Sequence, residues 1–580
     1  DIRLFVSSKV KNTHLIDLVC EKCNDSFLLA HEYVRILEDN NFDIDSISGV
    51  NGAISDLYGD TFNRLFGSSS YELSRIFLEI CLSCRDVITP KMMSDIMGIS
   101  EVEVNNLISR LSSLITVLPY KNKSIIQPRH KTLIDWLSSS MAGAFKLDLQ
   151  NGEKMLMSFC IKELTNDFED IDDYVVKHGI YYLNLKDSGG VIDLEKKKKA
   201  YGKLAANAHR YGYKQIEREA LDRWMILCDA DDIEQLMAEI DYATRFSPAK
   251  IIGLCDRATA LISIEKNEKK RFRYVNLIAT AMFYAGMDAD ALQMIKAERN
   301  HHDEIFWLDN SINSEYWHTV SLISHDLDSN EDVVKAATNS AMLYARVGKT
   351  YCSLISQVNL FDGYMAIGNL KKADEIVTNI FNELNTRYYV HVDDILHICY
   401  ANLLLTEGRL MEAFAEYEIG LSLAKDIQNW DYIYGKIWYA LALAEFYDVS
   451  AIKLLEQLIE EAEDSGYMYL VSLAWSFWGY ACFRNNKIPS REAYANAKAQ
   501  IIQKGKPGHI ATIISSGILM GIDEDYDLAV DNYLLCSGGK GCLSLTQELQ
   551  SAIKNKISTR KFNEFSIWVD KYWRAISEYR

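Results

Sequence analysis

The sequence predicts an almost entirely helical protein whose C-terminal half is a solenoid of stacked helical hairpins. Only six of the 580 residues are proline, and apolar residues recur at helical spacing over long stretches. A short layout also repeats, in which a glycine is followed five residues later by an alanine. It occurs at Gly286 and Ala291, Gly368 and Ala373, and Gly408 and Ala413. Glycine can end the first helix at positive φ, and alanine lets the second helix approach closely.

This layout resembles the tetratricopeptide repeat (TPR), in which each hairpin buries its apolar face against the next. The resemblance implies a TPR-like solenoid over residues 271–580. The repeat is irregular, because Gly368 and Gly408 are 40 residues apart and Gly286 and Gly368 are 82 apart. We therefore expect one further unit at about residues 313–348 and degenerate units after Gly408. The alternative is generic helical packing, since Gly and Ala are common.

The bulk composition limits the class of protein. A chain of 580 residues is expected to form two to four domains. The net charge of −19 disfavours non-specific nucleic-acid binding and favours a partner with basic patches. The sequence contains neither a transmembrane run nor a signal peptide. Its 12 cysteines lack a disulfide framework, which suits a reducing compartment. We expect a cytoplasmic protein that does not bind membranes.

The N-terminal run Ile2–Val6 is predicted to be a short buried strand. It is followed by Ser8 and Lys9. A strand that ends in polar and cationic side chains can present them to a phosphate in a nucleotide-binding sheet. An ordinary strand with a polar end is the alternative. Because the chain opens at Asp1 on this apolar run, we expect it to be part of a longer protein.

Residues 86–136 predict a winged helix. A helix should start after Pro90 and turn at Gly98–Ser100, and a second helix should run to about Ser113. Two short strands should follow around residues 121–123. Ser100 stands three residues before Glu103, which predicts a capping box at the start of the second helix. The predicted domains are a remnant of an NTPase core with a helical linker (1–52), the winged helix (53–146), helical linker repeats (147–270) and the solenoid (271–580).

Five segments of residues 1–190 resemble the region after the ATPase core in STAND-class NTPases, the signalling ATPases that include NACHT proteins. They are DIRLFVSSK, NDSFLLAHEYVRIL, VNGAISDLYGDTFNRLF, IIQPRHKTLIDWL and DDYVVKHGIYYLNL. In this resemblance the first segment is the sensor strand, a remnant of the α/β ATPase. The sequence departs from the family in the short stretch between Lys9 and Cys20, and its Walker A and B motifs would precede Asp1.

The resemblance implies candidate nucleotide contacts. His130 corresponds to a winged-helix histidine that holds the β-phosphate of ADP, and Ser8 and Lys9 are weaker candidates. Without the resemblance, His130 is better explained as a surface or strand-end histidine. ATP or ADP with Mg would be bound through the NTPase core, and this chain alone would bind no cofactor.

The residues at other candidate sites do not support a phosphate-binding, metal-binding or catalytic role. Gly348–Lys349–Thr350 ends like a phosphate-binding loop, but Leu343 stands where that loop requires glycine. The Gly-rich segment 537–541 follows no buried strand. The two CxxC pairs, which start at Cys20 and Cys81, lie in apolar stretches with helical spacing. Helix packing accounts for both pairs, so we expect no metal site. No motif predicts a catalytic residue.

The resemblance implies the regulatory and sensor portion of a STAND NTPase. Its solenoid would bind a protein trigger, such as a viral or phage structural or packaging protein, and drive ATP-dependent assembly into a tetramer or ring in antiviral defence. Candidate partner contacts are solenoid aromatics: Trp307, Trp317, Tyr388, Tyr389, Trp430 and Tyr434. The alternative is a TPR scaffold or a winged-helix transcriptional regulator. Against DNA binding, the predicted recognition region Glu101–Ser113 offers one cation, Arg110.

Overall fold

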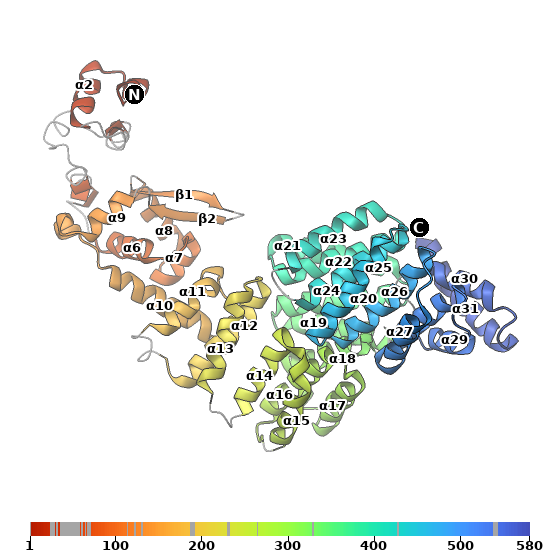
Figure 1. Cartoon of the computed structure of the whole chain (residues 1–580). Helices are drawn as coiled ribbons and strands as arrows, with labels where there is room; N and C mark the ends of the chain where they lie inside the picture. The colour runs from red at the N-terminus through yellow and green to blue at the C-terminus, as the bar shows by residue number, and fades with distance from the viewer. Residues whose placement is uncertain are drawn as a thin grey trace. The chain divides into compact units, whose positions relative to one another are not determined.

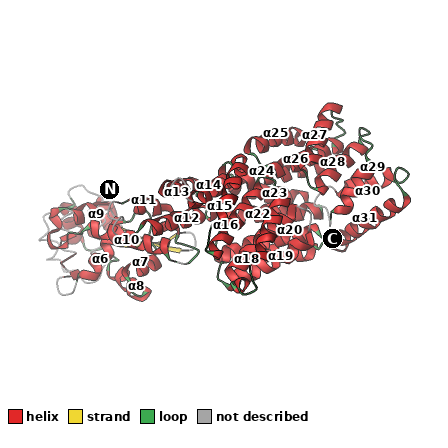
Figure 2. Ribbon diagram, turned by 90° about the horizontal axis from the view of Figure 1, so that it is seen from below, coloured by secondary structure: helices red, strands yellow, loops and turns green. Residues whose placement is uncertain are grey.

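The computed structural model describes most of the chain and divides it into two compact units, Asp1–Asp193 and Leu194–Arg580 (Figure 1). The described residues are 2–23, 71–112, 114–120, 123–128, 131–166, 168–185, 192–228, 233–263, 265–326, 330–425, 429–536 and 543–579, with isolated positions between 30 and 66. Helices dominate both units (Figure 2). Among the described residues, no helix is both long and apolar enough to cross a membrane.

The N-terminal run is a helix, so the predicted sensor strand is wrong. Helix α1 spans Ile2–Lys9, and α2 spans Thr13–Lys22 with Asn12 as its N-cap. Val6 is fully buried and belongs to one apolar cluster with Ile16 and Val19. A run of five apolar residues fits a strand or one face of a helix equally well, and here packing against α2 favours the helix. The described residues include no strand that pairs with this run.

The elements predicted between residues 86 and 136 are present in the predicted order. Helix α6 (Glu72–Ser83) precedes α7 (Pro90–Met97), α8 (Glu101–Arg110), β1 (Ile115–Tyr120), β2 (Lys123–Pro128) and α9 (Lys131–Ser138). The strands form an antiparallel hairpin, and Ile88 adds a bridge to Ile126. Gly98 ends α7 at a φ of 67°. The predicted capping box is confirmed, because Ser100 and Glu103 exchange both side chain to backbone hydrogen bonds.

A buried carboxylate joins this region to the helices that follow it. They are η1 (Ser140–Phe145), α10 (Leu149–Thr165) and α11 (Asp173–Asn184). Glu79 on α6 is fully buried, and it accepts hydrogen bonds from the Asp148 N–H (3.0 Å) and from Asn151 Nδ2 (2.6 Å) at the start of α10. A Cβ added at Gly152 would lie 2.2 Å from the Glu79 carbonyl oxygen. The close approach of α6 and α10 therefore requires glycine at this position.

The second unit is a solenoid of helical hairpins that begins at Leu194, whereas the solenoid was predicted over residues 271–580. Its helices are α12 (Leu194–Arg210), α13 (Lys214–Leu227), α14 (Ile233–Phe246), η3 (Pro248–Lys250), α15 (Ile251–Ile262), α16 (Glu268–Tyr284), α17 (Asp288–His301), η4 (Phe306–Leu308), α18 (Asn310–Asp326), α19 (Asn330–Arg346), α20 (Thr350–Ala366), α21 (Leu370–Thr386), α22 (Val390–Glu407), α23 (Leu410–Ala424), α24 (Asn429–Glu445), α25 (Ser450–Ser465), α26 (Met468–Arg484), α27 (Arg491–Lys504), α28 (Pro507–Leu519), α29 (Tyr526–Leu535), α30 (Leu543–Ile553) and α31 (Thr559–Tyr579). Even-numbered helices are the first helices of the hairpins, and each odd-numbered helix is the second. Helices α18 and α19 form the unit that was predicted at about 313–348.

The three predicted turn glycines are confirmed. Gly286, Gly368 and Gly408 have φ values of 75°, 78° and 81° between the two helices of their hairpins. In the next two hairpins Tyr447 (φ 59°) and Asn486 (φ 53°) take this left-handed place. Degenerate repeats thus keep the turn conformation after losing the glycine, which is why the sequence pattern fades.

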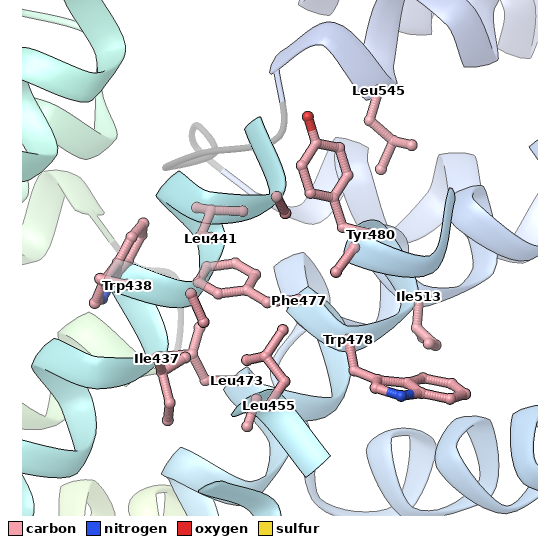
Figure 3. Close-up of a cluster of buried hydrophobic side chains, with 14 of the residues drawn as sticks. Ile437, Trp438, Leu441, Leu455, Leu473, Phe477, Trp478, Tyr480, Ile513 and Leu545 are labelled. Carbon is pink, nitrogen blue, oxygen red and sulfur yellow. The ribbon is translucent and has the colours of Figure 1, made fainter. Parts of the chain in front are cut away.

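The core confirms the packing logic of the repeat. Ala291, Ala373 and Ala413 are fully buried, as the close approach of the two helices requires. The largest apolar cluster joins successive first helices (Figure 3): Ile437, Trp438 and Leu441 on α24, Leu473, Phe477, Trp478 and Tyr480 on α26, and Ile513 on α28. Gly479 lies inside α26. A Cβ there would come within 2.4 Å of Ile513 Cδ1, so Gly479 sets the spacing of α26 and α28.

Candidate functional site

The solenoid has two edges made of turns. We call the turns that join the two helices of one hairpin the tip edge. Its described turns are 211–213, 247–250, 285–287, 367–369, 408–409, 446–449, 485–490 and 520–525. We call the turns that join one hairpin to the next the linker edge. Its described turns include 302–309, 347–349, 387–389, 466–467 and 505–506. Because the hairpins stack in the same sense, each set of turns follows one side of the solenoid.

The tip edge of the early hairpins packs against the linker edge of much later ones. A Cβ added at Gly466 would lie 2.8 Å from the Ala249 nitrogen, and one at Gly286 would lie 3.1 Å from Met468 Cβ. Lys506 Nζ donates to the His325 carbonyl oxygen at 3.4 Å, across 181 positions of the sequence. Helix α12 likewise contacts α22, and α21 contacts α31. We call this interface the seam. It joins one superhelical turn of the solenoid to the next.

Aromatic rings line the seam. The Tyr284 ring on α16 meets the Trp430 ring on α24 edge to face, with 6.0 Å between centroids. The Tyr211 and Tyr389 rings are 6.1 Å apart, and the Arg210 guanidinium lies 4.6 Å from the centre of the Tyr351 ring. Such contacts add to the free energy of apolar burial.

An ion pair with a buried carboxylate joins the first two hairpins of the solenoid, beside the seam. Glu217 on α13 is 1% exposed and accepts a hydrogen bond from Arg245 Nη1 at 2.6 Å. Arg245 also binds the Asp241 carboxylate at 3.0 Å, and His209 Nδ1 lies 3.2 Å from Glu217 Oε1. Burial alone would raise the pKa of Glu217, but His209 and Arg245 lower it on balance. Burial lowers the pKa of His209, and the neighbouring Glu217 carboxylate opposes that effect.

Across the seam from this pair lies His391, which belongs to a network of three hydrogen-bonded side chains. The rings of His209 and His391 are 4.3 Å apart. His391 Nδ1 lies 2.6 Å from Tyr351 Oη, and its Nε2 lies 3.2 Å from Asp431 Oδ2. The order Tyr–His–Asp looks like a catalytic relay. However, the three residues are buried, and burial raises the pKa of Tyr351 well above its ordinary value, which is the opposite of what a nucleophile needs. This hydrogen-bonded network is therefore structural.

Asp394 is the least satisfied group of this region. It is fully buried on α22, and Oδ2 has no hydrogen-bond partner among the described residues. Burial, followed by repulsion from Asp431, raises its pKa well above the ordinary value. The surroundings of Asp394 thus favour the protonated form of its carboxyl group, so ionisation there costs stability.

Asp394→Asn should therefore raise the free energy of unfolding. Because the folded-state pKa is raised, the folded chain holds this proton when the unfolded chain has released it. Wild-type stability then falls as pH rises above about 4, where an unfolded Asp ionises. Urea unfolding at several pH values should show a gain that grows from pH 4 to pH 7. Asp393→Asn is the control, because Asp393 binds His397 at 3.4 Å and its loss should not stabilise the chain. Equal effects of the two variants would contradict the assignment.

The structure divides the six aromatic candidates. Trp307, Tyr389 and Tyr434 are buried in the core, so a partner cannot reach their side chains in this conformation. Trp317 and Trp430 are partly buried, and Trp430 belongs to the seam. Tyr388 is 50% exposed and donates a hydrogen bond to Asp393. It is the one member of this set whose ring is open to a partner.

The structure describes two of the three candidate nucleotide contacts. Ser8 and Lys9 lie in the last turn of α1, where the Ser8 hydroxyl donates to the Phe5 carbonyl oxygen (2.7 Å). The geometric reason for choosing them, the end of a strand, is therefore absent. His130 lies outside the described residues. Within the described part of the chain, no group of three or more His, Cys, Asp or Glu side chains is arranged to hold a metal ion.

Sequence reasoning missed the seam residues. Glu217, Arg245 and His391 lie in helical stretches where nothing in their spacing distinguishes them from ordinary surface residues. Glu217 and Arg245 are 28 positions apart, and His391 is 40 positions from Tyr351 and from Asp431. A local pattern carries no information about such contacts. A glycine at a turn, such as Gly466, was the one local sign, since it also marks a close approach to Ala249.

Comparison with known proteins gives a structural match. The chain is similar to the crystal structure of a Signal Transduction ATPase with Numerous Domains (STAND) protein with a tetratricopeptide repeat sensor from Pyrococcus horikoshii. The match covers 87% of this chain and 72% of that chain, with 11% identity and a TM-score of 0.38. No family model matches the sequence, and no curated protein matches it.

Proposed function

We propose that this chain is the regulatory and sensor portion of a STAND-class NTPase, whose solenoid binds a protein trigger. The observation that carries this proposal is the seam. A solenoid whose successive turns are joined by a limited set of contacts has two available arrangements, closed and open. A ligand that binds the open arrangement more tightly shifts the protein toward it, and a ligand that binds both equally shifts nothing. The seam therefore supplies the two-state element that a sensor needs.

The energetic requirement is modest. Moving the seam from about 1% to about 99% open requires a trigger that prefers the open form roughly 10⁴-fold, or about 5.5 kcal/mol. The seam combines a buried ion pair, aromatic contacts and close backbone approaches at Gly466 and Gly286. A protein interface readily provides this free energy.

The relay would run through the first unit. Helices α7 and α8 with the β1–β2 hairpin have the order of a winged helix, and the resemblance of the sequence gives His130 the role of holding the β-phosphate of ADP in the resting state. ATP or ADP with Mg would be bound by the NTPase core of the longer protein. Once the winged helix no longer holds the nucleotide, ADP would be exchanged for ATP, and the protein would assemble into a tetramer or ring.

The biological setting follows the same resemblance. We propose cytoplasmic antiviral defence of the NACHT-like kind, with a phage structural or packaging protein as the trigger. Neither membrane nor nucleic acid would be a direct partner.

The position of Arg110 supports this choice over the transcriptional regulator. Helix α8 would be the recognition helix, and it carries Glu101 and Glu103 in its first turn. Its cation Arg110 donates to the Leu65 carbonyl oxygen at 3.0 Å and lies 4.9 Å from the centre of the Phe66 ring. This guanidinium is therefore turned into the unit, whereas DNA binding requires several cations directed at phosphates.

Binding of purified phage proteins to the full chain tests the proposal. Immobilised chain would be exposed to portal, major capsid and terminase proteins, and to duplex DNA at low salt, in biolayer interferometry. We expect one of the proteins to bind and the duplex not to bind. If none of the proteins binds, or if the duplex binds more tightly than they do, the proposed function is wrong.

A seam variant tests the gating step separately. Gly466→Ala should weaken the seam and so raise the apparent affinity for the trigger about tenfold, because more of the chain is already open. Gly348→Ala is the matched control, since Gly348 has nearly the same φ (76° against 79°) but open space around it. If the trigger binds both variants with the same affinity, the trigger assignment stands and gating by the seam is wrong.

A further inference from the structure

The two edges that form the seam are left uncovered at opposite ends of the solenoid. On the tip edge, the hairpins after Gly408 expose large apolar side chains by 54–73%: Met411, Phe446, Tyr447, Val449 and Ile488. On the linker edge, the hairpins before α18 expose others by 75–77%: Ile226, Ile305 and Leu308. We call these sets the tail patch and the head patch.

The covered part of the same edges behaves differently. On the tip edge within the seam, Tyr211, Tyr284 and Met287 are partly buried. On the linker edge within the seam, Tyr467 is 1% exposed and Tyr389 is fully buried. Large apolar side chains are thus a feature of both edges. Beside the seam contacts, Tyr388 and Ile252 are 50% and 51% exposed, whereas the members of the tail and head patches are exposed by 54–77%. Exposed apolar patches on soluble proteins commonly mark interfaces.

Tyr447 provides a second, independent observation. Its φ of 59° is unusual for a bulky residue, and the equivalent position is glycine at Gly286, Gly368 and Gly408 and asparagine at Asn486. The ring is nevertheless 62% exposed, with the Arg484 guanidinium 4.2 Å from its centre. A strained backbone that presents an aromatic ring to solvent gains little inside the chain, and such strain is typical of functional sites.

We propose that the tail patch binds the head patch of a second copy of this chain, so that the seam continues from one molecule to the next. The seam already shows that a tip edge and a linker edge of this sequence pack together. The tail patch is a free tip edge and the head patch a free linker edge. A second copy therefore offers the partner of the required kind, and the contact is heterologous, head to tail. This inference requires neither a trigger nor a nucleotide.

Net charge sets the salt dependence of this association. Each copy carries −19, so two copies repel each other at low ionic strength. Apolar contacts at the patches are not weakened by salt, whereas the repulsion is screened. Association should therefore become tighter as ionic strength rises.

Sedimentation velocity of the full chain over a concentration series tests the proposal. Wild type should self-associate, and more strongly at high salt. Phe446→Glu disables the tail patch and Ile305→Glu disables the head patch, so each variant alone should associate at least tenfold more weakly. Ile567→Glu is the control, because Ile567 is 69% exposed on α31 outside both patches and gains the same charge.

Mixing the two variants gives the decisive result. Phe446→Glu keeps an intact head patch and Ile305→Glu keeps an intact tail patch, so an equimolar mixture should form a one-to-one dimer that grows no further. A misfolded variant could not restore this contact. The proposal is overturned if wild type stays monomeric, if either variant associates like wild type, or if the mixture stays monomeric. It is also overturned if Ile567→Glu abolishes association, since another surface would then be responsible.

Discussion

Glu217→Ala should lower the free energy of unfolding by about 3–5 kcal/mol, the usual effect of removing one partner of a buried ion pair. The Glu217 side chain is 1% exposed, and its carboxylate is the link between Arg245 and His209. The substitution leaves the partly buried Arg245 guanidinium, which is 20% exposed, with the Asp241 carboxylate as its remaining partner. A charge that loses a partner inside the protein loses more than a surface charge does, because water does not replace the missing contact.

Glu219→Ala provides the control two residues away. Glu219 also pairs with an arginine, Arg223, at 3.3 Å, but the carboxylate side chain is 51% exposed. Its loss should cost less than about 0.5 kcal/mol, as for other surface pairs on helices. Urea unfolding followed by circular dichroism measures both differences. If the two variants were equally stable, Glu217 would not be part of a buried network.

Gly466→Ala should have the second largest effect, and its origin lies in the seam. The φ of 79° costs a residue with a Cβ about 1–2 kcal/mol. The new Cβ would also meet the Ala249 backbone at 2.8 Å, and overpacking of this kind costs about 1–3 kcal/mol more. Because Ala249 is backbone at this contact, no side chain can rotate away. The clash must push the two edges apart.

Gly348→Ala separates the two contributions. Gly348 has a φ of 76° and no atom within 4 Å of an added Cβ, so this variant carries the backbone strain without the clash. We expect Gly466→Ala to exceed it by about 1–3 kcal/mol in unfolding free energy. Small-angle scattering should show a larger radius of gyration for Gly466→Ala alone. Identical behaviour would mean that Gly466 acts only through its own backbone.

The solenoid was predictable because its signals are local. A glycine at a hairpin turn and a buried alanine five residues later depend on neighbours in the same hairpin, as Gly368 and Ala373 illustrate. The capping box at Ser100 and Glu103 is equally local. Ile2–Val6 was misassigned because five apolar residues have no distinct period, so the packing of Val6 decides between helix and strand.

The candidate site was not predictable for the opposite reason. The seam depends on how far the superhelix rotates per hairpin, which sums small angles over many units. No local pattern states that Lys506 will reach the carbonyl of His325. The same limit applies to the aromatics: Tyr388 and Tyr389 are adjacent in sequence, yet one is half exposed and the other fully buried.

Hydrogen exchange at two equivalent turns tests the central claim, the closed seam, most directly. Gly286 and Gly408 have similar φ values, and their N–H groups donate to the Phe283 and Leu405 carbonyl oxygens at 2.9 and 3.0 Å. They differ in that an added Cβ at Gly286 would lie 3.1 Å from Met468 Cβ, whereas Gly408 belongs to the α22–α23 hairpin, after the hairpins whose tips make the seam contacts described above. We predict at least tenfold slower exchange at Gly286, with the difference lost in Gly466→Ala. Equal exchange at Gly286 and Gly408 in the wild-type chain would contradict a closed superhelix.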